Sequence, residues 1–400
     1  MPIHSWYKFT AGFSYALVDG VISREKLKPS IARIYDPFAG CGTTLVSCQT
    51  KGYEAVGNEG QKLMYDIIRA KLNWKLSQNK LEQHLESIRD QVTRVSTSQV
   101  HSLLASLYEP ETLNALIGIR DAIRSIPNSK YRLFFNLALS QTLHKVSVHP
   151  IAVPYISRNR TIQNVGKAWD RFRSTVENMV EEMAAVRYLP STATVFLHDS
   201  RRVNPKIEDG SCSLCLTSPP YLNNLDYGEV SKVHTHFFGI TESWNDITTK
   251  VRAKLVTGST THYKESEVGV QTYKESELYL SGASVAKRIL VKSEEIKKVA
   301  SERAGKKSFD KLALMYFLDM RNVLAEIRRI VKPNGKAYLV LGDSAPYGIY
   351  VPTTRFLGEI AKTVGFERYE SHRIRTRGTK WKSLKHRHSM ELPENIMILK

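Results

Sequence analysis

The sequence predicts an α/β protein in which helices cover both faces of a sheet. Three observations predict it: short apolar segments typical of strands, amphipathic segments typical of helices between them, and a glycine-rich turn after an early strand. Strands and helices that alternate in this way form mainly parallel sheets, and ligands bind where the carboxyl ends of the strands meet. Functional residues are therefore expected at the ends of the predicted strands.

The first strand–turn–helix–strand unit is predicted to bind a nucleoside-bearing cofactor. Its first strand ends at Asp36, and its second strand ends 23 residues later at Glu59, where an acid takes ribose hydroxyls. Gly40 and Gly42 let the backbone approach a ligand closely, and the helix that starts at Thr43 offers free N–H groups to a carboxylate or phosphate. The turn lacks the three spaced glycines of a dinucleotide site and the Lys-Ser/Thr of a triphosphate site. The expected ligand is therefore smaller than a dinucleotide.

Two later strand ends carry further candidate residues. Asp199 follows an apolar run that starts at Ala193, where an acid reaches the amine of an adenine ring; a helix cap is the alternative. The run 213–216 leads into Thr-Ser-Pro-Pro-Tyr at 217–221, and its two prolines end the strand because they cannot continue a ladder. This turn presents a hydroxyl, a carbonyl and an aromatic ring, which suit a planar base that bears an amine.

The predicted frame is interrupted by two segments of different character. From 61 to 189 apolar residues recur at spacings of three and four, which predicts an inserted helical unit. From 226 to 307 the chain is polar and poorly periodic until a charged helix at 287–302. This segment repeats the sequence Tyr-Lys-Glu-Ser-Glu at 263–267 and at 273–277, which we interpret as a duplication in a surface loop.

The frame resumes in the last part of the sequence. An amphipathic helix is expected to stop at the Pro-Asn-Gly of 333–335, and a strand follows at 336–343. Residues 351–364 are predicted to form another helix, and 395–399 a last strand.

The charge of the chain predicts a polyanionic partner. The 58 Lys and Arg exceed the 39 Asp and Glu and give a net charge of +19, which favours nucleic acid. Eight Lys and Arg, one acid and Trp381 lie between residues 368 and 388, a pattern that tracks phosphates; a charged, solvated hairpin is the alternative. The candidates from this stretch are Arg373, Arg375, Arg377, Lys380, Trp381 and Lys382. A basic loop adds Arg158 and Arg160, for which a solvated loop is the alternative.

The cysteines and the apolar runs narrow the class of protein further. Cys212 and Cys215 are expected to point to opposite faces of a strand, and no second pair with ligand spacing exists. We therefore expect no metal site and four reduced, packed thiols, Cys41 and Cys48 being the other two. The sequence shows no signal peptide and no run near the roughly 20 apolar residues that span a bilayer. A cytoplasmic protein without a membrane partner is expected, and its oligomeric state is not defined by the sequence.

The turn at 36–44 together with the Thr-Ser-Pro-Pro-Tyr at 217–221 resembles the S-adenosylmethionine-dependent methyltransferases that modify exocyclic amino groups of DNA bases. The resemblance covers 1–60, 190–225 and 308–400, and it implies a Rossmann-like class I methyltransferase sheet. The motif with Ser218 is similar to the N4-cytosine branch, since N6-adenine relatives more often carry Asp or Asn there. No motif covers the helical insertion at 61–189 or the segment 226–307, the candidate target-recognition insertion.

The resemblance also implies roles for the candidate cofactor residues. The glycine-rich turn, with Phe38, would hold the methionine part of S-adenosyl-L-methionine, and its carboxylate would lie at Thr43. Glu59 would bind the ribose hydroxyls and Asp199 the adenine amine. Asp36 would fix the turn or approach the methionine amine. An N-terminal aromatic cluster matches the cofactor lid by position, and its candidates are Tyr7 and Phe9, for which simple packing is the alternative.

The same resemblance implies catalysis by alignment and hydrogen bonding. Ser218 Oγ and the Pro219 carbonyl would each accept an N–H of the amine, next to Pro220, and Tyr221 would stack on the base after it leaves the duplex. DNA is the expected partner, in a prokaryotic or phage nucleoid, with a cognate restriction endonuclease expected from the family. The alternatives are N6 of adenine in DNA, N2 of guanine in RNA, and a nucleic-acid-binding module of the same fold without catalysis.

Overall fold

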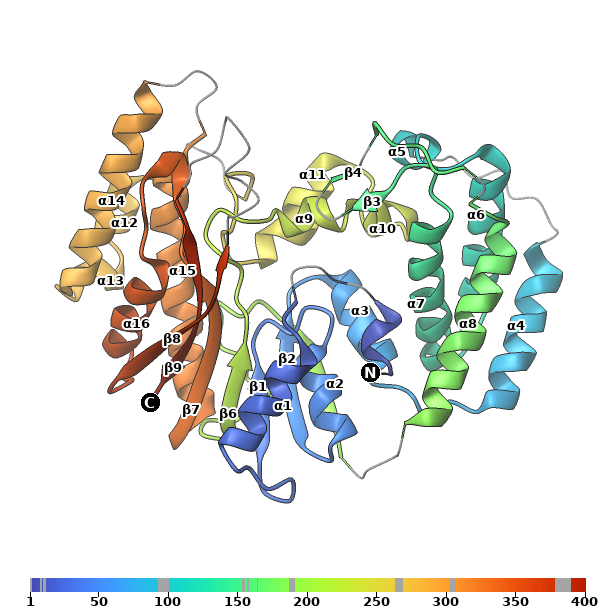
Figure 1. Ribbon diagram of the computed structural model, residues 1–400, viewed down its shortest axis with the longest axis horizontal. Helices are drawn as coiled ribbons and strands as arrows, with labels where there is room; N and C mark the ends of the chain where they lie inside the picture. Colours follow the sequence, from blue (N-terminus) through green and yellow to red (C-terminus); the bar gives the residue numbers. More distant parts are fainter. Residues whose placement is uncertain are drawn as a thin grey trace.

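The computed structural model describes residues 2–7, 9, 12–92, 101–152, 155–156, 158–163, 165–186, 191–262, 269–302, 307–377 and 390–400. In these residues the chain forms a seven-stranded sheet with the strand order β5-β2-β1-β6-β7-β9-β8 (Figure 1). The five strands from β5 to β7 are parallel, and β9 is antiparallel to both of its neighbours. The strands are β1 (Arg33–Asp36), β2 (Glu54–Glu59), β5 (Ala193–Leu197), β6 (Cys212–Thr217), β7 (Val331–Gly342), β8 (Tyr369–Arg377) and β9 (Leu392–Leu399).

Alternate residues of the sheet pack into two separate cores, one on each face. Ile34 and Leu214 pack with the helices α1 (Tyr15–Arg24) and α2 (Thr43–Thr50). Tyr35 packs on the other face with α15 (Phe309–Ile330) and α16 (Thr353–Thr363). Helices therefore cover both faces, and the predicted Rossmann-like fold is confirmed.

Two predictions about these strands were wrong. Cys212 and Cys215 both pack in the core that contains α15, because the pairing of β6 with β7 shifts register between Cys212 and Leu214. All four cysteines are free and buried, as expected. The strand predicted at 336–343 begins earlier, at Val331, so that residues 333–335 lie within β7. Strand β8 falls in the basic stretch for which a charged, solvated hairpin was the alternative; it pairs with β9, and its charged residues face solvent at the edge of the sheet.

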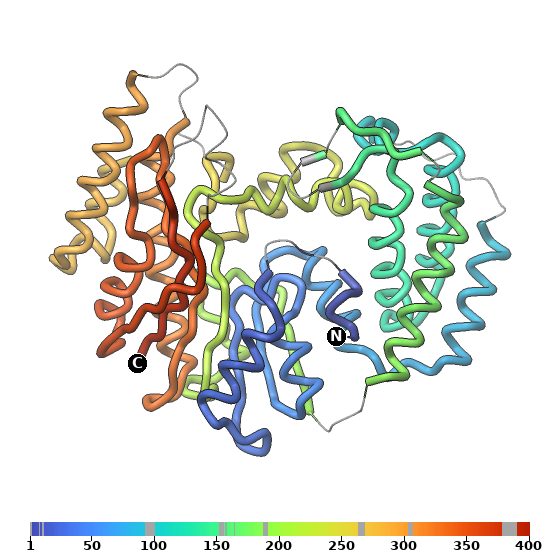
Figure 2. The backbone as a smooth tube through the Cα atoms, in the orientation of Figure 1, coloured from blue at the N-terminus to red at the C-terminus, as the bar shows by residue number. Residues whose placement is uncertain are grey.

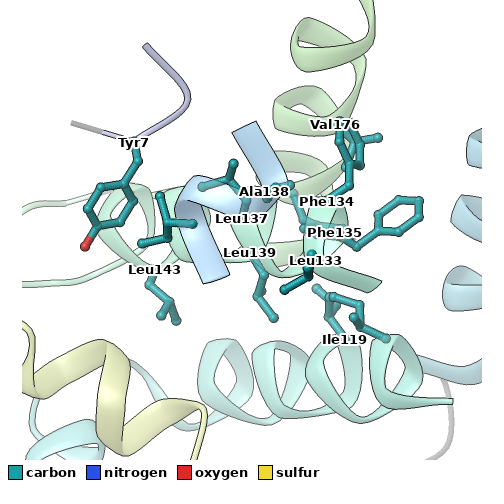
Figure 3. Close-up of a cluster of buried hydrophobic side chains, with 14 of the residues drawn as sticks. Tyr7, Ile119, Leu133, Phe134, Phe135, Leu137, Ala138, Leu139, Leu143 and Val176 are labelled. Atoms are coloured by element: carbon teal, nitrogen blue, oxygen red, sulfur yellow. The ribbon is translucent and has the colours of Figure 1, made fainter. Parts of the chain in front are cut away.

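A helical unit lies beside the sheet, as the three- and four-residue spacings predicted. It contains α4 (Gln78–Val92), α5 (Ser102–Ala105), α6 (Pro110–Arg124), α7 (Ser129–Lys145), α8 (Ala168–Ala185) and a small hairpin of β3 (Ile151–Ala152) and β4 (Tyr155–Ile156). Figure 3 shows its core, with Tyr7 of the N-terminal segment on one side and Ile119 of α6 and Val176 of α8 on the other. Helix α3 (Lys62–Lys71) joins this unit to the sheet: Ile67 packs in the helical core and Ile68 in the core with α1 and α2.

The N-terminal segment is held by the helical unit. A 3₁₀ turn, η1 (His4–Trp6), lies beside α3 and α7 (Figure 2). The backbone N–H of Ile3 donates to Glu182 Oε2 at 2.7 Å, and the Ser5 hydroxyl donates to Glu182 Oε1 at 3.0 Å. Trp6 is buried with its ring edge against Phe134, at 5.8 Å between ring centres.

The segment between β6 and α15 occupies two separate places in Figure 1. Its first part lies above the carboxyl ends of β1 and β2 and contains α9 (Tyr227–Val230), α10 (Lys232–Phe237), α11 (Trp244–Asp246), a π-helical turn (Ile247–Val251) and a 3₁₀ turn (Arg252–Lys254). Its second part lies at the outside of the molecule and contains α12 (Val270–Lys274), α13 (Glu277–Leu280) and α14 (Ser284–Ser301), which packs against α15 and α16.

The second copy of the repeated sequence is not in a surface loop. Its Tyr273 is fully buried in α12 and donates to the backbone oxygen of Ala286 at 3.0 Å. The first copy lies outside the described residues. Among the described residues, no helix combines the length and the apolar character needed to cross a membrane.

Candidate active site

A pocket lies where the chain leaves the carboxyl ends of β1, β2 and β6. It brings the glycine-rich turn, the acid at the end of β2 and the Ser-Pro-Pro loop onto one surface. It is lined by Phe9, Gly12, Phe13, Asp36, Phe38, Ala39, Gly40, Cys41, Thr43, Glu59, Gln61, Met64, Ser218, Pro220, Tyr227 and Leu255. Of the predicted cofactor residues, Phe9, Asp36, Phe38, Gly40, Thr43 and Glu59 therefore share one cavity.

The glycine-rich turn owes its shape to two left-handed residues. Gly40 has a φ of 55° and Gly42 a φ of 87°, a region that side chains disfavour. Gly42 precedes the first residue of α2 and does not line the pocket; a Cβ there would lie 3.3 Å from Ile68. Gly42 thus shapes the turn, and Gly40 and Thr43 face the cavity.

Glu59 joins the ends of β1 and β2 through backbone groups. Its Oε2 accepts the N–H of Gly40 at 2.9 Å, and its Oε1 accepts the N–H of Gln61 at 2.8 Å. Burial raises the pKa of Glu59 to about 7, although these N–H groups favour the ionised form. A carboxylate oxygen has room for a second donor, so Glu59 can still accept hydroxyl groups from a ligand.

Asp36 joins the glycine-rich turn to the Ser-Pro-Pro-Tyr loop at 218–221. Its Oδ1 accepts the Thr217 hydroxyl at 2.6 Å and the N–H of Phe38 at 3.0 Å. Burial raises the pKa of Asp36 to about 6, against the effect of these donors. The two sequence motifs, which are 181 residues apart at these positions, are thus linked by one buried hydrogen bond.

Asp199 and Tyr7 do not line the pocket. The Asp199 carboxylate is bound by Arg201, with Nη2 to Oδ2 at 2.7 Å and Nε to Oδ1 at 2.9 Å. Arg201 also pairs with Asp319 at 3.3 Å and donates to the backbone oxygen of Ala253 at 2.7 Å. Ala253 precedes the pocket residue Leu255 by two positions in the sequence. Tyr7 is buried against His234, with 5.7 Å between ring centres. In the N-terminal cluster, Phe9 reaches the pocket and packs near Tyr227.

The Ser-Pro-Pro-Tyr loop is fixed by groups from three other elements. The Ser218 hydroxyl donates to the backbone oxygen of Val340 over a long 3.4 Å, and the Pro220 carbonyl accepts the Tyr316 hydroxyl at 3.0 Å. Pro219, which stands between these two residues in the sequence, is buried. The Tyr221 hydroxyl donates to Glu394 Oε1 at 3.1 Å, so that strand β9 orients the ring.

One of the predicted DNA-binding arginines contacts this loop, and a second binds the carboxylate that holds Tyr221. The Arg377 guanidinium lies 4.8 Å from the centre of the Tyr221 ring, and Arg375 pairs with Glu394. Arg373 is exposed on the same strand. Arg158 and Arg160 are exposed beside the β3–β4 hairpin, and Lys380, Trp381 and Lys382 lie outside the described residues.

Sequence reasoning missed Arg201, Glu394, Tyr227 and Leu255. Tyr227 and Leu255 come from a segment without a recognisable motif, and Glu394 of β9 binds Tyr221, which follows β6. One signal was available: Arg201 stands two residues after the candidate acid Asp199, within reach of its carboxylate.

The sheet order, the glycine-rich turn and the adjacent Ser-Pro-Pro-Tyr loop define a Rossmann-like methyltransferase fold. No family model matches the chain. The chain is 23% identical to the type II methyltransferase M.AvaI of Nostoc sp., over 91% of this chain and 79% of the relative. It is 21% identical to M.BsoBI of Geobacillus stearothermophilus over 94% and 81%, and 20% identical to M.MvaI of Kocuria varians over 88% and 77%. These relatives support a DNA methyltransferase family for this chain, at low identity.

Proposed function

We propose that this protein is an S-adenosylmethionine-dependent DNA methyltransferase of a restriction–modification system that methylates N4 of a flipped cytosine. The observation that carries the proposal is one pocket shared by the β1 turn and the Ser-Pro-Pro-Tyr loop, which the Asp36–Thr217 hydrogen bond joins. The names of the type II relatives support DNA methylation and a restriction–modification context.

The cofactor side of the pocket fits S-adenosyl-L-methionine, which supplies a methyl group on an activated sulfonium. Gly40 lets the backbone approach the methionine part, and the first turn of α2 at Thr43 offers N–H groups to its carboxylate. Glu59 accepts the ribose hydroxyls, and Phe9 covers the pocket from the N-terminal side. Asp199 lies outside the lining of the pocket with its carboxylate bound by Arg201, so it would accept the adenine amine only if its side chain turned toward the pocket.

The base side of the pocket activates the amine by hydrogen bonding. The amine of cytosine is a weak nucleophile because its lone pair is delocalised into the ring. The proton of Ser218 points to Val340, so the lone pairs of Oγ can accept one N–H, and the Pro219 carbonyl accepts the other. Two acceptors draw the nitrogen toward tetrahedral geometry and free its lone pair, and alignment then provides most of the acceleration.

Mass spectrometry of nucleosides tests this function. DNA and RNA are each incubated with the purified protein and the methyl-labelled cofactor, then digested. N4-methylcytosine in DNA is expected, at a level at least about 100-fold above that of the Ser218→Ala variant. N6-methyladenine in DNA, N2-methylguanine in RNA or no labelled nucleoside would each replace the proposal by one of its alternatives.

A further inference from the structure

Arg377 ends the edge strand β8 and reaches the Ser-Pro-Pro-Tyr loop at 218–221. Its guanidinium carbon lies 4.8 Å from the centre of the Tyr221 ring, and its Nη2 donates to the backbone oxygen of Asp343 at 2.6 Å. A Cβ at Gly342 would lie 2.3 Å from Nη2, so any larger residue at 342 would displace this side chain. The fold therefore places Arg377 in a defined position beside the loop.

In the part of the chain that the structure describes, no carboxylate forms an ion pair with Arg377. Glu394 is the carboxylate with the largest electrostatic effect on Arg377, and it is already bound by Arg375 and by the Tyr221 hydroxyl. The Nε–H of Arg377 is buried, and no described residue accepts it. Burial lowers the pKa of the guanidinium, yet an arginine side chain stays charged at neutral pH. A partly buried cation with a buried, unused Nε–H donor indicates an acceptor on a bound ligand.

The neighbours of Arg377 restrict the chemistry of that ligand. Ser218 lines the pocket, and Arg377 lies over the ring of Tyr221 beside it. In the proposed function Ser218 and Pro219 accept the amine and Tyr221 faces the base, so Arg377 adds donors alone. On cytosine the amine N4 is followed along the base edge by N3 and O2, which are two adjacent acceptors. On adenine the amine N6 is followed by N1 and then a C–H. One edge of a guanidinium can therefore make two parallel hydrogen bonds with cytosine and one with adenine.

We propose that Arg377 donates through Nε and Nη2 to N3 and O2 of the target cytosine and so selects cytosine over adenine. The inference rests on the proposed function and adds a second residue to Ser218 in the choice of base. Nη2 carries two hydrogens, so one stays on the Asp343 oxygen while the other turns to the base. Arg375 and Glu394 position Tyr221 and leave Arg377 for the substrate.

Removal of single acceptors from the base tests the contact. The sequence that the wild-type protein methylates is first mapped on bacterial DNA, and the methylated nucleoside identifies the target base. Single-turnover rates are then measured on duplexes with cytosine or 3-deazacytosine, in which a C–H replaces N3, for the wild type and for Arg377→Ala and Arg377→Lys. Arg173→Ala is the matched control, because Arg173 is an exposed arginine of α8 that pairs with Glu177 at 2.8 Å.

We expect Arg377→Ala to lower the rate on cytosine by about 10- to 100-fold without changing cofactor affinity. 3-Deazacytosine should slow the wild type and Arg173→Ala by a similar factor but slow Arg377→Ala by less than about 3-fold. Arg377→Lys, which keeps the charge but not the two parallel donors, should lose most of the sensitivity to the analogue and gives the answer if Arg377→Ala does not fold. Equal sensitivity to 3-deazacytosine in the wild type and both variants would overturn the inference and assign Arg377 to a phosphate. An adenine product from the wild type would instead overturn the proposed function.

Discussion

The two sides of the pocket are built by different means. The cofactor side, at the ends of β1 and β2, is made mainly by backbone: left-handed glycines shape the turn, and backbone N–H groups hold Glu59. The side that we propose for the base, at the ends of β6 to β9, is made by side chains that are far apart in the sequence. Tyr221 and Glu394 are 173 residues apart, and Arg377 comes from a third strand.

This difference predicts which side of the pocket can vary by substitution of single residues. A backbone turn keeps its shape when side chains vary, so the cofactor side suits a reaction whose methyl donor is constant. A side-chain cluster can be altered residue by residue, so the base side is where the choice of target base is expected to vary. The Asp36–Thr217 hydrogen bond is the point at which the two sides meet.

The largest effect is expected on the base side. Ser218→Ala and Tyr221→Ala should each lower the methylation rate by about 100-fold or more, because they remove an acceptor for the amine and the ring for the base. Cofactor affinity, measured by calorimetry, should stay within about 2-fold of the wild type. Ser213→Ala, on the same strand, is the control. Near wild-type turnover by both variants would remove this loop from catalysis.

An effect on binding alone is expected on the cofactor side. Glu59→Ala should weaken cofactor binding by about 10- to 100-fold, since a buried carboxylate that accepts hydroxyls is lost. Because the pKa of Glu59 is raised to about 7, cofactor affinity of the wild type should fall as the pH drops from 8 to 6, and Glu59→Gln should show no such dependence. Calorimetry at several pH values measures both.

The raised pKa has the opposite effect on folding. A carboxyl whose pKa in the folded state exceeds its unfolded value contributes most stability below the unfolded pKa and loses it as the pH rises through the folded pKa. The free energy of unfolding should therefore decrease between about pH 4.5 and 7 through Glu59, while cofactor affinity increases.

For the binding prediction, a cofactor affinity that is the same for Glu59→Ala and the wild type would remove Glu59 from the ribose role.

The smallest effect is expected where the helical unit holds the N-terminal segment. Glu182→Ala removes the acceptor of Ile3 N–H and of the Ser5 hydroxyl and should loosen the segment that carries Phe9 to the pocket. We expect cofactor affinity to weaken by about 3- to 10-fold with an unchanged rate at saturating cofactor. Glu181→Ala, the exposed neighbour on α8, should behave as the wild type. If both variants bind alike, the cofactor side does not depend on the helical unit.

The sequence predicted the parts of this fold that depend on local patterns. The unit from β1 to β2, the end of β6 and the helices α14 to α16 follow from apolar spacing, glycines and prolines within short segments. Strand β8 was covered only by the alternative of a charged hairpin, because pairing with β9 and not burial defines this strand. The faces of Cys212 and Cys215 depended on an irregularity in the pairing of β6 with β7, which alternation within one strand does not reveal.

The candidate site divides in the same way. Asp36, Gly40, Thr43 and Glu59 were found from their spacing, and the structure brings them into one cavity. The acid that orients Tyr221 and the position of Arg377 depend on contacts between distant elements, whereas the partner of Asp199 lies two residues away in the sequence. Residue type predicted that Arg377 binds a nucleic acid, whereas only its contact with Tyr221 suggests which part of the nucleic acid it reads.

Helix α3 has a consequence for anyone who wishes to recombine this protein with its relatives. One side of the helix, with Leu63 and Ile67, completes the interior of the helical unit, and the other, with Ile68, completes the interior beneath α1 and α2. A graft that joins a foreign helical unit after β2 would leave one of these interiors open unless α3 is chosen to match both. Helix α3 therefore belongs to both parts, and a successful chimera would have to keep the contacts of α3 with both interiors.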